Sequence, residues 1–208
     1  MVTGHFGFAA GVKGKETFVP LWALMLASVW LDVLFIPLFA VGAETIDDAP
    51  GTSGGYGDVI IHADYTHSLV GAILISLVTG WIATRWWGRR GGVVIGAVVF
   101  SHWVLDLIVH RHDMPILPGN LGDVRVGFGL WKVEWASILA EAALVLGGAY
   151  LYWRAAQSVE RAAGRPPSRA NLVAALIIVF GAVVLALDVF AGQIEPENVS
   201  QAAGLPCS

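Results

Sequence analysis

The stretch GGVVIGAVVFSHWVLDLIV occupies residues 91–109 and decides the fold class. It holds a single charged residue, Asp106, in a run that is otherwise apolar apart from Ser101 and His102. A helix that crosses the hydrocarbon core of a bilayer needs about 20 mostly apolar residues. Residues 91–109 are therefore predicted to form a membrane-spanning helix.

Four further stretches have the same character, and the composition of the whole chain agrees with them. Of the 208 residues, 56% are hydrophobic and only 13% are charged, and the mean hydropathy is +0.69, whereas soluble domains carry about 25% charged residues. These values exclude a soluble globular domain and a disordered chain. A net charge of −4 without a basic stripe excludes nucleic-acid binding. We predict an all-α, polytopic helical membrane protein with five transmembrane helices, at residues 18–43, 66–87, 91–109, 131–153 and 170–191.

The segments outside the five spans are classified by their length and polarity. Residues 4–14 are too few to cross the membrane and are predicted to form a short N-terminal helix, half-inserted beside the first span. Residues 1–192 are predicted to be a single integral-membrane domain, and residues 193–208 a polar C-terminal tail. Residues 44–57, rich in Gly, Thr, Ser and Asp, are predicted to be a polar outer loop. The first span is too long for a cleaved signal peptide and contains Asp32.

Lysine and arginine are distributed unevenly over the connections, which predicts the orientation in the membrane. If the N-terminal side is inside, nine basic residues fall inside and three outside, and the outside segments carry acidic residues instead. The C-terminus is then predicted to lie outside. The inside residues are Lys13, Lys15, Arg85, Arg89, Arg90, Arg154, Arg161, Arg165 and Arg169, and the outside residues are Arg111, Arg125 and Lys132.

Ionisable residues within the spans are the candidates for function. Such a group costs about 2.5–3.5 kcal/mol at membrane depth, so it is expected to face the protein interior and to have a partner. His102, Asp106 and His110 are spaced i, i+4, i+8 and lie on one ridge of the third span. Because this span runs from inside to outside, the ridge is expected in the outer half of the membrane.

Residues from other segments are expected at the same depth. His62 and His67 lie at the outer start of the second span, where Thr66 is predicted to be the helix N-cap. Asp32 lies about 20 Å above the inner end of the first span at 1.5 Å per residue. If the N-terminal helix packs beside the first span, His5 rises toward Asp32.

Histidines and carboxylates without a thiol form a ligand set for Zn²⁺ or another divalent transition metal. One or two such ions are predicted at a site of six residues: His5, Asp32, His62, His67, His102 and Asp106. The alternatives are a plain His102–Asp106 pair, capping or solvation for His67 and His62, and a free side chain for His5.

A hydrolytic site also needs a group that moves protons. Glu134 and Glu141 share one face of the fourth span, and Glu141 is deep enough to require a partner. Glu134 or His110 is predicted to carry the proton of a metal-activated water.

The outer loop after the third span carries charged residues beside the predicted site. Arg111 and Arg125 are predicted to bind an anionic head group, because arginine binds phosphate oxygens in a bidentate manner. The alternative is that Arg111 pairs with Asp113 or Asp123 at the surface. His112 and Asp113 are predicted to lie on a solvated rim.

The segments HADYTHSL (residues 62–69), SHWVLDLIVHRHDMP (residues 101–115) and VGFGLW (residues 126–131) follow an N-terminal Gly-His and a mid-span aspartate. Together they resemble the bacterial family of membrane-bound metal-dependent hydrolases, over residues 4–155. That family is itself distantly similar to the zinc-dependent phospholipase C and P1 nuclease group, whose helical active sites bind several zinc ions through His and Asp. The chain departs from the family pattern at Ala63 and His112, where proline is expected. The resemblance implies metal ligands at His5, Asp32, His62, His67, His102 and Asp106, with His110 alongside.

The residues and the resemblance together predict a zinc-dependent hydrolase of the bacterial cytoplasmic (inner) membrane. Its partners are expected to be membrane lipids, and its substrate a lipid or envelope phosphoester with an anionic head group, reached from the outer leaflet. One alternative is a metal- or proton-handling transporter that uses the same residues as a relay. Against transport, the chain has no inverted repeat and few polar residues in the inner half. The other alternative is a structural membrane protein with a buried polar cluster.

Overall fold

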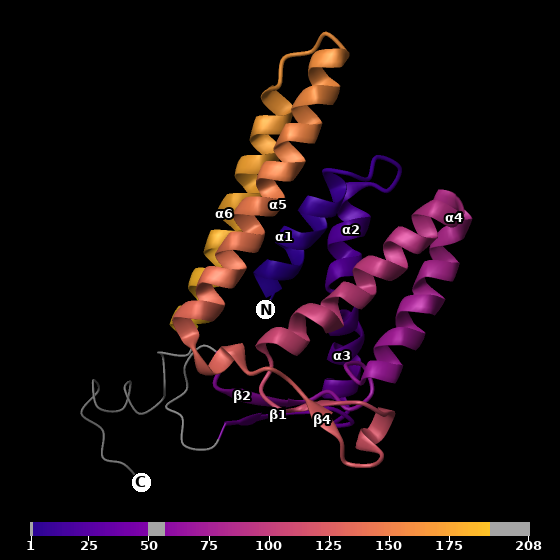
Figure 1. Cartoon of the computed structure of the whole chain (residues 1–208), viewed down its shortest axis with the longest axis vertical. Helices are drawn as coiled ribbons and strands as arrows, with labels where there is room; N and C mark the ends of the chain where they lie inside the picture. The colour runs from indigo at the N-terminus through magenta and orange to yellow at the C-terminus, as the bar shows by residue number, and fades with distance from the viewer. Residues whose placement is uncertain (1, 50–56, 192–208) are drawn as a thin grey trace, which may run out of the picture.

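The computed structural model describes residues 2–49 and 57–191 and is mostly helical, which confirms the all-α class. Two short antiparallel sheets, which the sequence analysis did not predict, lie at one end of the helices (Figure 1). The helices are α1 (Val2–Lys13), α2 (Leu21–Ser28), α3 (Trp30–Ala40), α4 (Leu69–Val109), α5 (Glu134–Ala162) and α6 (Ser168–Ala191), with the 3-10 turns η1 (Pro118–Asn120) and η2 (Leu130–Lys132). The sheets pair β1 (Thr45–Asp48) with β2 (Val59–His62), and β3 (Met114–Pro115) with β4 (Arg125–Val126).

Within residues 2–49 and 57–191, three helices are long and apolar enough to cross a membrane, namely α4, α5 and α6. α2 and α3 are too short to pass the test alone and pass it only as a pair. The chain bends by 48° between them, at Val29. Helix length therefore supports three spans, or four with the bent pair, and does not support the predicted five. The difference arises in α4, which contains the predicted second and third spans in one 41-residue helix with no loop between them.

α4 turns back on itself at Trp87 and Gly88, whose dihedral angles are not helical. Gly88 has a φ of +62°, a conformation that glycine adopts easily because it has no Cβ. Figure 1 shows the two arms of α4 meeting at this turn and diverging toward the sheets. A Cβ on Gly92 would lie 2.5 Å from the carbonyl oxygen of Gly80, so glycine permits the close approach of the two arms.

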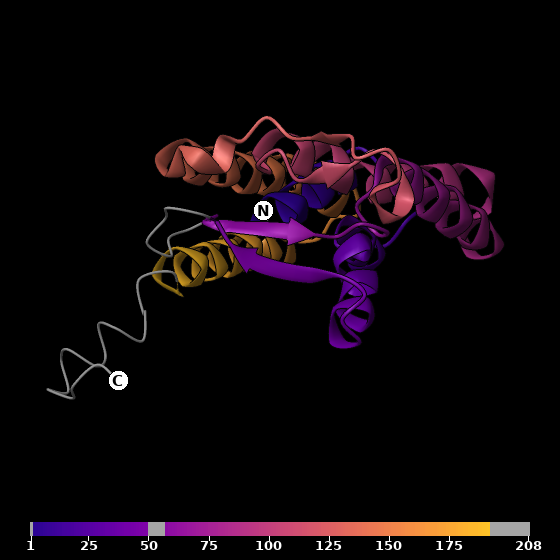
Figure 2. The ribbon, with the colours of Figure 1, turned by 90° about the horizontal axis from the view of Figure 1, so that it is seen from below.

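α1 is the short N-terminal helix that the sequence predicts, and it packs against α2, α4, α5 and α6. Figure 2 shows its first turn enclosed by these elements. The contact with α5 depends on glycine. A Cβ on Gly148 would lie 1.8 Å from the carbonyl oxygen of Gly7, and a Cβ on Gly7 would lie 2.5 Å from the backbone of Leu144.

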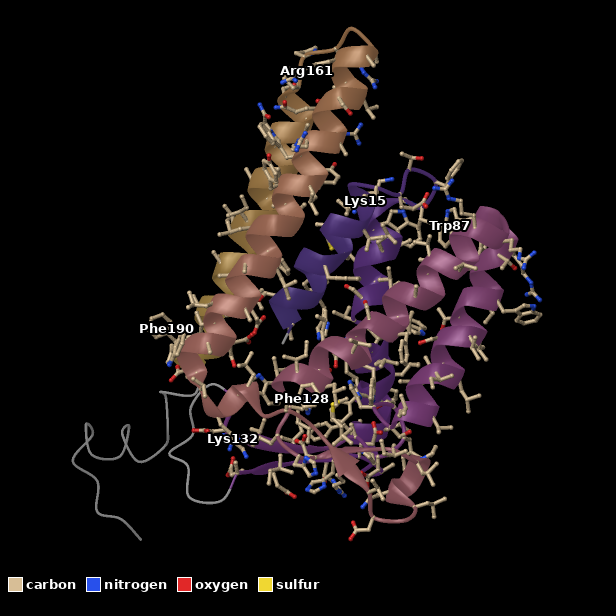
Figure 3. The ribbon with its side chains drawn as sticks, viewed as in Figure 1. Lys15, Trp87, Phe128, Lys132, Arg161 and Phe190 are labelled. Carbon is tan, nitrogen blue, oxygen red and sulfur yellow. The ribbon has the colours of Figure 1, made fainter. Side chains whose placement is uncertain are left out.

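The two ends of the helices differ in charge. The α1–α2 connection, the turn of α4 and the α5–α6 connection lie at one end, called here the basic end (Figure 1). In Figure 3, Lys15 and Arg161 lie toward this end, whereas Phe128 and Lys132 lie toward the other, called the sheet end. The predicted inner residues thus share one end of the molecule. The predicted polar tail, residues 193–208, lies outside the described residues, as do residues 50–56 of the predicted outer loop.

Candidate metal centre

The ridge predicted on the third span is present on the second arm of α4. His102, Asp106 and His110 are all buried, as their helical spacing predicts. Asp106 contacts several imidazoles: its Oδ2 lies 2.9 Å from Nε2 of His102 and 3.8 Å from Nε2 of His110, and its Oδ1 lies 3.1 Å from Nε2 of His5. Asp106 is therefore the centre of the cluster.

Asp32 and His67 join this cluster from two other segments. Val29 interrupts the helix, and Asp32 lies in the first turn of α3, immediately after the interruption. Nε2 of His67 lies 3.1 Å from Nε2 of His102, and Oδ1 of Asp32 lies 3.4 Å from each of these nitrogens. The side chain of Asp32 is 42% exposed, so the otherwise buried cluster opens on its side.

Hydrogen bonds at Nδ1 determine which ring nitrogen of His102 and of His67 carries a proton. Nδ1 of His102 lies 2.7 Å from the carbonyl oxygen of Ser28, the last residue of α2, where helix carbonyls lack a partner within the helix. Nδ1 of His67 lies 2.9 Å from the hydroxyl of Thr66, which itself donates to the carboxylate of Glu44. Both Nδ1 atoms therefore carry a proton, so in the neutral form of each ring the lone pair lies on Nε2. Two lone pairs that face each other at 3.1 Å repel unless a proton or a cation lies between them.

Glu44 is a part of the site that sequence analysis missed. Its side chain is buried and accepts hydrogen bonds from the backbone N–H groups of Tyr65 and Thr66, both at 2.8 Å. The predicted N-cap was wrong, because Ser68 caps α4 by accepting from the N–H of Gly71 at 3.1 Å. Thr66 instead connects Glu44 to the cluster. A carboxylate that orients a histidine in this way is typical of metal centres.

His5 reaches the cluster from α1, where it contacts Asp106 and His102. Its Nε2 donates to Oδ1 of Asp106, and its ring stacks on that of His102 with 3.9 Å between centroids. Its Nδ1 is buried and has no hydrogen-bond partner among the described residues.

The start of α1 is held by Glu141. The hydroxyl of Thr3 and the N–H of Gly4, at 3.1 Å, both donate to one oxygen of this carboxylate. Glu141 is fully buried, so the prediction that it needs a partner is confirmed. A negative charge is also favoured at a helix N-terminus. Glu141 therefore fixes the turn of α1 that carries His5.

His110 lies at the edge of the cluster. Its Nδ1 lies 3.1 Å from Oδ1 of Asp113, and its ring packs against Trp131. The predicted solvated rim was wrong for Asp113, whose side chain is buried and accepts from the N–H of Ile61 at 3.0 Å. This pairing leaves the lone pair of His110 on Nε2, the atom nearest Asp106.

Two predicted site residues lie apart from the cluster. His62 is the last residue of β2, where its Nε2 lies 3.1 Å from Oδ2 of Asp47 on the paired strand. The pairing of the two strands therefore directs His62 to the sheet and not to the metal ligands. Glu134 is exposed in the first turn of α5, and within the described chain no hydrogen bond or ion pair connects it to the cluster.

The two outer arginines are paired with acids of the sheet end. Arg111 Nη2 lies 2.7 Å from Oδ1 of Asp58, which is neither of the partners considered from the sequence. Arg125 Nη2 lies 3.6 Å from Oδ1 of Asp64, and its Nη1 donates to the carbonyl oxygen of Asp113 at 3.2 Å. Both guanidinium groups therefore hold the loops together at this end.

Four atoms of the cluster are candidate metal ligands: Nε2 of His67, Nε2 of His102, Oδ1 of Asp32 and Oδ2 of Asp106. The ligand atoms of Asp32, His67 and His102 all lie within 4.8 Å of one another. Oδ2 of Asp106 lies 2.9 Å from Nε2 of His102 and 3.7 Å from Nε2 of His67. Ligands about 2.1 Å from a tetrahedral zinc ion lie about 3.4 Å from one another. Together with the converging lone pairs, this spacing fits a divalent cation.

Comparison with known proteins adds little to this geometry. No known protein family and no solved structure matches the chain. A triacylglyceride transporter of Mycolicibacterium smegmatis is 31% identical over 94 residues, a match that covers 36% of this chain and 17% of that protein. The chain thus spans a small part of the length of this relative.

Proposed function

We propose that this protein is a membrane-embedded, metal-dependent hydrolase that holds a zinc ion, or another divalent transition metal, with His67, His102 and Asp106, beside Asp32. The observation that carries the proposal is the convergence of two imidazole nitrogens and two carboxylate oxygens, with Oδ1 of Asp32 and Oδ2 of Asp106 each within 3.7 Å of both nitrogens. Nitrogen and oxygen ligands without a thiol suit zinc. One ion is proposed, because Oδ1 of Asp106 already accepts from His5 and only Oδ2 is left to bind it.

The four residues differ in exposure, which suggests different roles. His67, His102 and Asp106 are buried and would hold the ion, whereas Asp32 lies at the open side. Catalytic zinc sites combine three protein ligands with one position for water or substrate. A bound zinc ion would lower the pKa of a water to about 7 and polarise the scissile bond.

His110 is the proton acceptor in this proposal. Asp113 holds its Nδ1–H, so Nε2 keeps a lone pair at the edge of the cluster. This Asp–His arrangement orients the imidazole and stabilises it once it is protonated. Glu134 is not assigned this role, because it is exposed and, among the described residues, no hydrogen bond or ion pair joins it to the cluster.

The proposed substrate is an ester or phosphoester of a membrane lipid. The cluster lies among apolar helices and is open at Asp32, the side from which a lipid would reach it. Transport is less well supported. Among the described residues toward the basic end, Ser76 and Thr84 donate to carbonyl oxygens of their own helix, and a polar path does not continue from the cluster.

Metal content tests the centre directly. Protein purified without added metal is expected to contain about one equivalent of zinc or a similar ion by elemental analysis. His102→Ala is expected to lose most of it, because it removes a ligand. The matched control is His62→Ala, which removes a histidine that pairs with Asp47 and should keep the metal. Full occupancy in His102→Ala, or an equal loss in His62→Ala, contradicts the site.

Turnover tests the reaction class. Purified, metal-loaded protein is incubated with vesicles of phospholipids and neutral lipid esters, and released products are measured by chromatography. Chelation and His110→Ala are each expected to abolish hydrolysis, whereas Glu134→Ala should leave it unchanged. Hydrolysis that persists after chelation would show a different mechanism, and stoichiometric metal without turnover on any lipid would argue against a hydrolase.

We further propose that both arms of α4 cross the membrane, giving five crossings in the bacterial inner membrane with the basic end in the cytoplasm. The support is the gathering of basic residues at one end. Single cysteines at Tyr65, Arg89 and Lys132, in a Cys207→Ser background, are treated with a membrane-impermeant maleimide in intact spheroplasts. Positions 65 and 132 should be labelled and position 89 protected until lysis. Labelling of only one of positions 65 and 132 would mean that α4 crosses once.

A further inference from the structure

The two arms of α4 enclose a groove of about 580 Å³ that the proposed reaction does not use. Gly80, Gly92 and Gly96 leave part of it without side chains, and its walls include Leu77 and Val93, each about two-thirds exposed. Its volume falls in the range of ligand pockets, about 300–1,000 Å³. An apolar groove of this size suits a hydrocarbon chain.

One positive charge lies on this groove without a partner. Three arginines surround the turn of α4: Arg85 stacks over the ring of Trp81 at 4.9 Å, and Arg90 pairs with Glu16 at 3.3 Å. Arg89 lines the groove and has no acid or aromatic partner in the described part of the chain. A guanidinium group at the end of an apolar groove is complementary to a molecule with a phosphate at one end and a hydrocarbon chain at the other.

We propose that this groove binds one phospholipid with an anionic head group, with the phosphate at Arg89 and an acyl chain along the three glycines. Both parts of the ligand are needed. The hydrocarbon wall alone does not distinguish lipids, whereas a basic residue at the membrane surface favours an anionic lipid by about 1 kcal/mol, or about fivefold in affinity. This site lies toward the basic end and is independent of the metal centre.

Lipid retention in native mass spectrometry tests whether the charge of Arg89 selects an anionic head group. The full chain is released from nanodiscs that contain equal amounts of phosphatidylglycerol and phosphatidylcholine with identical acyl chains. Phosphatidylglycerol is expected to be retained about fivefold more. Arg89→Gln should abolish this preference, and Arg154→Gln, which removes a charge on α5 outside the groove, should preserve it. Equal retention of the two lipids by the unaltered protein would overturn the proposal.

A second variant tests the groove. Ala97 lines it and is exposed, so Ala97→Phe should fill it and reduce retention of both lipids. Ala182→Phe places the same side chain at an exposed site on α6 and should have no effect. Unchanged retention in Ala97→Phe would place the lipid elsewhere. A dimer that Ala97→Phe dissociates would show that a second copy occupies the groove, and would also overturn the proposal. If Ala97→Phe fails to fold, the Arg89→Gln comparison still decides the question.

Discussion

Replacement of Asp106 by alanine is expected to remove the bound metal and to lower the free energy of unfolding by about 3–5 kcal/mol. One oxygen of Asp106 contacts His102 and the other contacts His5, and both oxygens are buried. The variant therefore loses a proposed metal ligand and leaves buried imidazoles without an acceptor. Loss of the metal adds to the effect, since an ion present at 1,000 times its Kd stabilises the folded state by about 4 kcal/mol.

The isosteric variant Asp106→Asn separates the two contributions. Its amide can still hydrogen-bond to the imidazoles but carries no charge, so it should lose the metal while keeping more of the stability. Metal content by elemental analysis and thermal unfolding in detergent, with and without added zinc, give the two readouts. If Asp106→Ala kept its metal and its melting temperature, Asp106 would not be the centre of the cluster.

Replacement of Gly148 by valine is expected to separate α1 from α5 and to cost about 3 kcal/mol, the upper part of the usual range for overpacking. The new Cβ would lie 1.8 Å from the carbonyl oxygen of Gly7, and backbone atoms cannot move aside as a side chain can. Because α1 carries His5, the displacement should also weaken metal binding.

The neighbouring glycine provides a matched control. A Cβ on Gly147 meets no atom within 4 Å, so Gly147→Val should unfold at nearly the same temperature as the unaltered protein and keep its metal. Thermal unfolding and elemental analysis of the two variants make the comparison. Equal stability of both would show that α1 does not pack on α5 through Gly7 and Gly148.

The centre of the site could be predicted because it depends on helix geometry alone. His102, Asp106 and His110 share a ridge in any α-helix, whatever surrounds it. His5 could be placed because its segment is too short to span the membrane and must pack beside other helices. The cost of a charge in the membrane correctly implied that Asp32 and Glu141 have partners.

The rest depends on contacts between distant segments, which spacing does not reveal. Glu44 reaches Thr66 because the chain that leads into β1 folds back onto the start of α4. The Ser28 carbonyl is available to His102 because α2 ends there, before Val29. The contact of His62 with Asp47 depends on the register of β1 and β2. Because residue spacing does not reveal that register, His62 is predicted as a ligand from the sequence. The sequence separates two spans at Gly88, Arg89 and Arg90, whereas in the structure the chain turns at Trp87 and Gly88 inside one continuous α4.

The hydrogen bond between Thr3 and Glu141 has a consequence for biosynthesis. These residues are 138 positions apart, and a ribosome that adds about 5–20 residues per second needs roughly 7–28 s to make the intervening chain. α1 is therefore made well before the helix that holds its first turn in place. Until α5 has been inserted, His5 has no fixed position beside Asp106. The candidate ligands His67, His102 and Asp106 are thus all made before Glu141, whereas the contact of His5 with Asp106 is fixed only once α5 is in place.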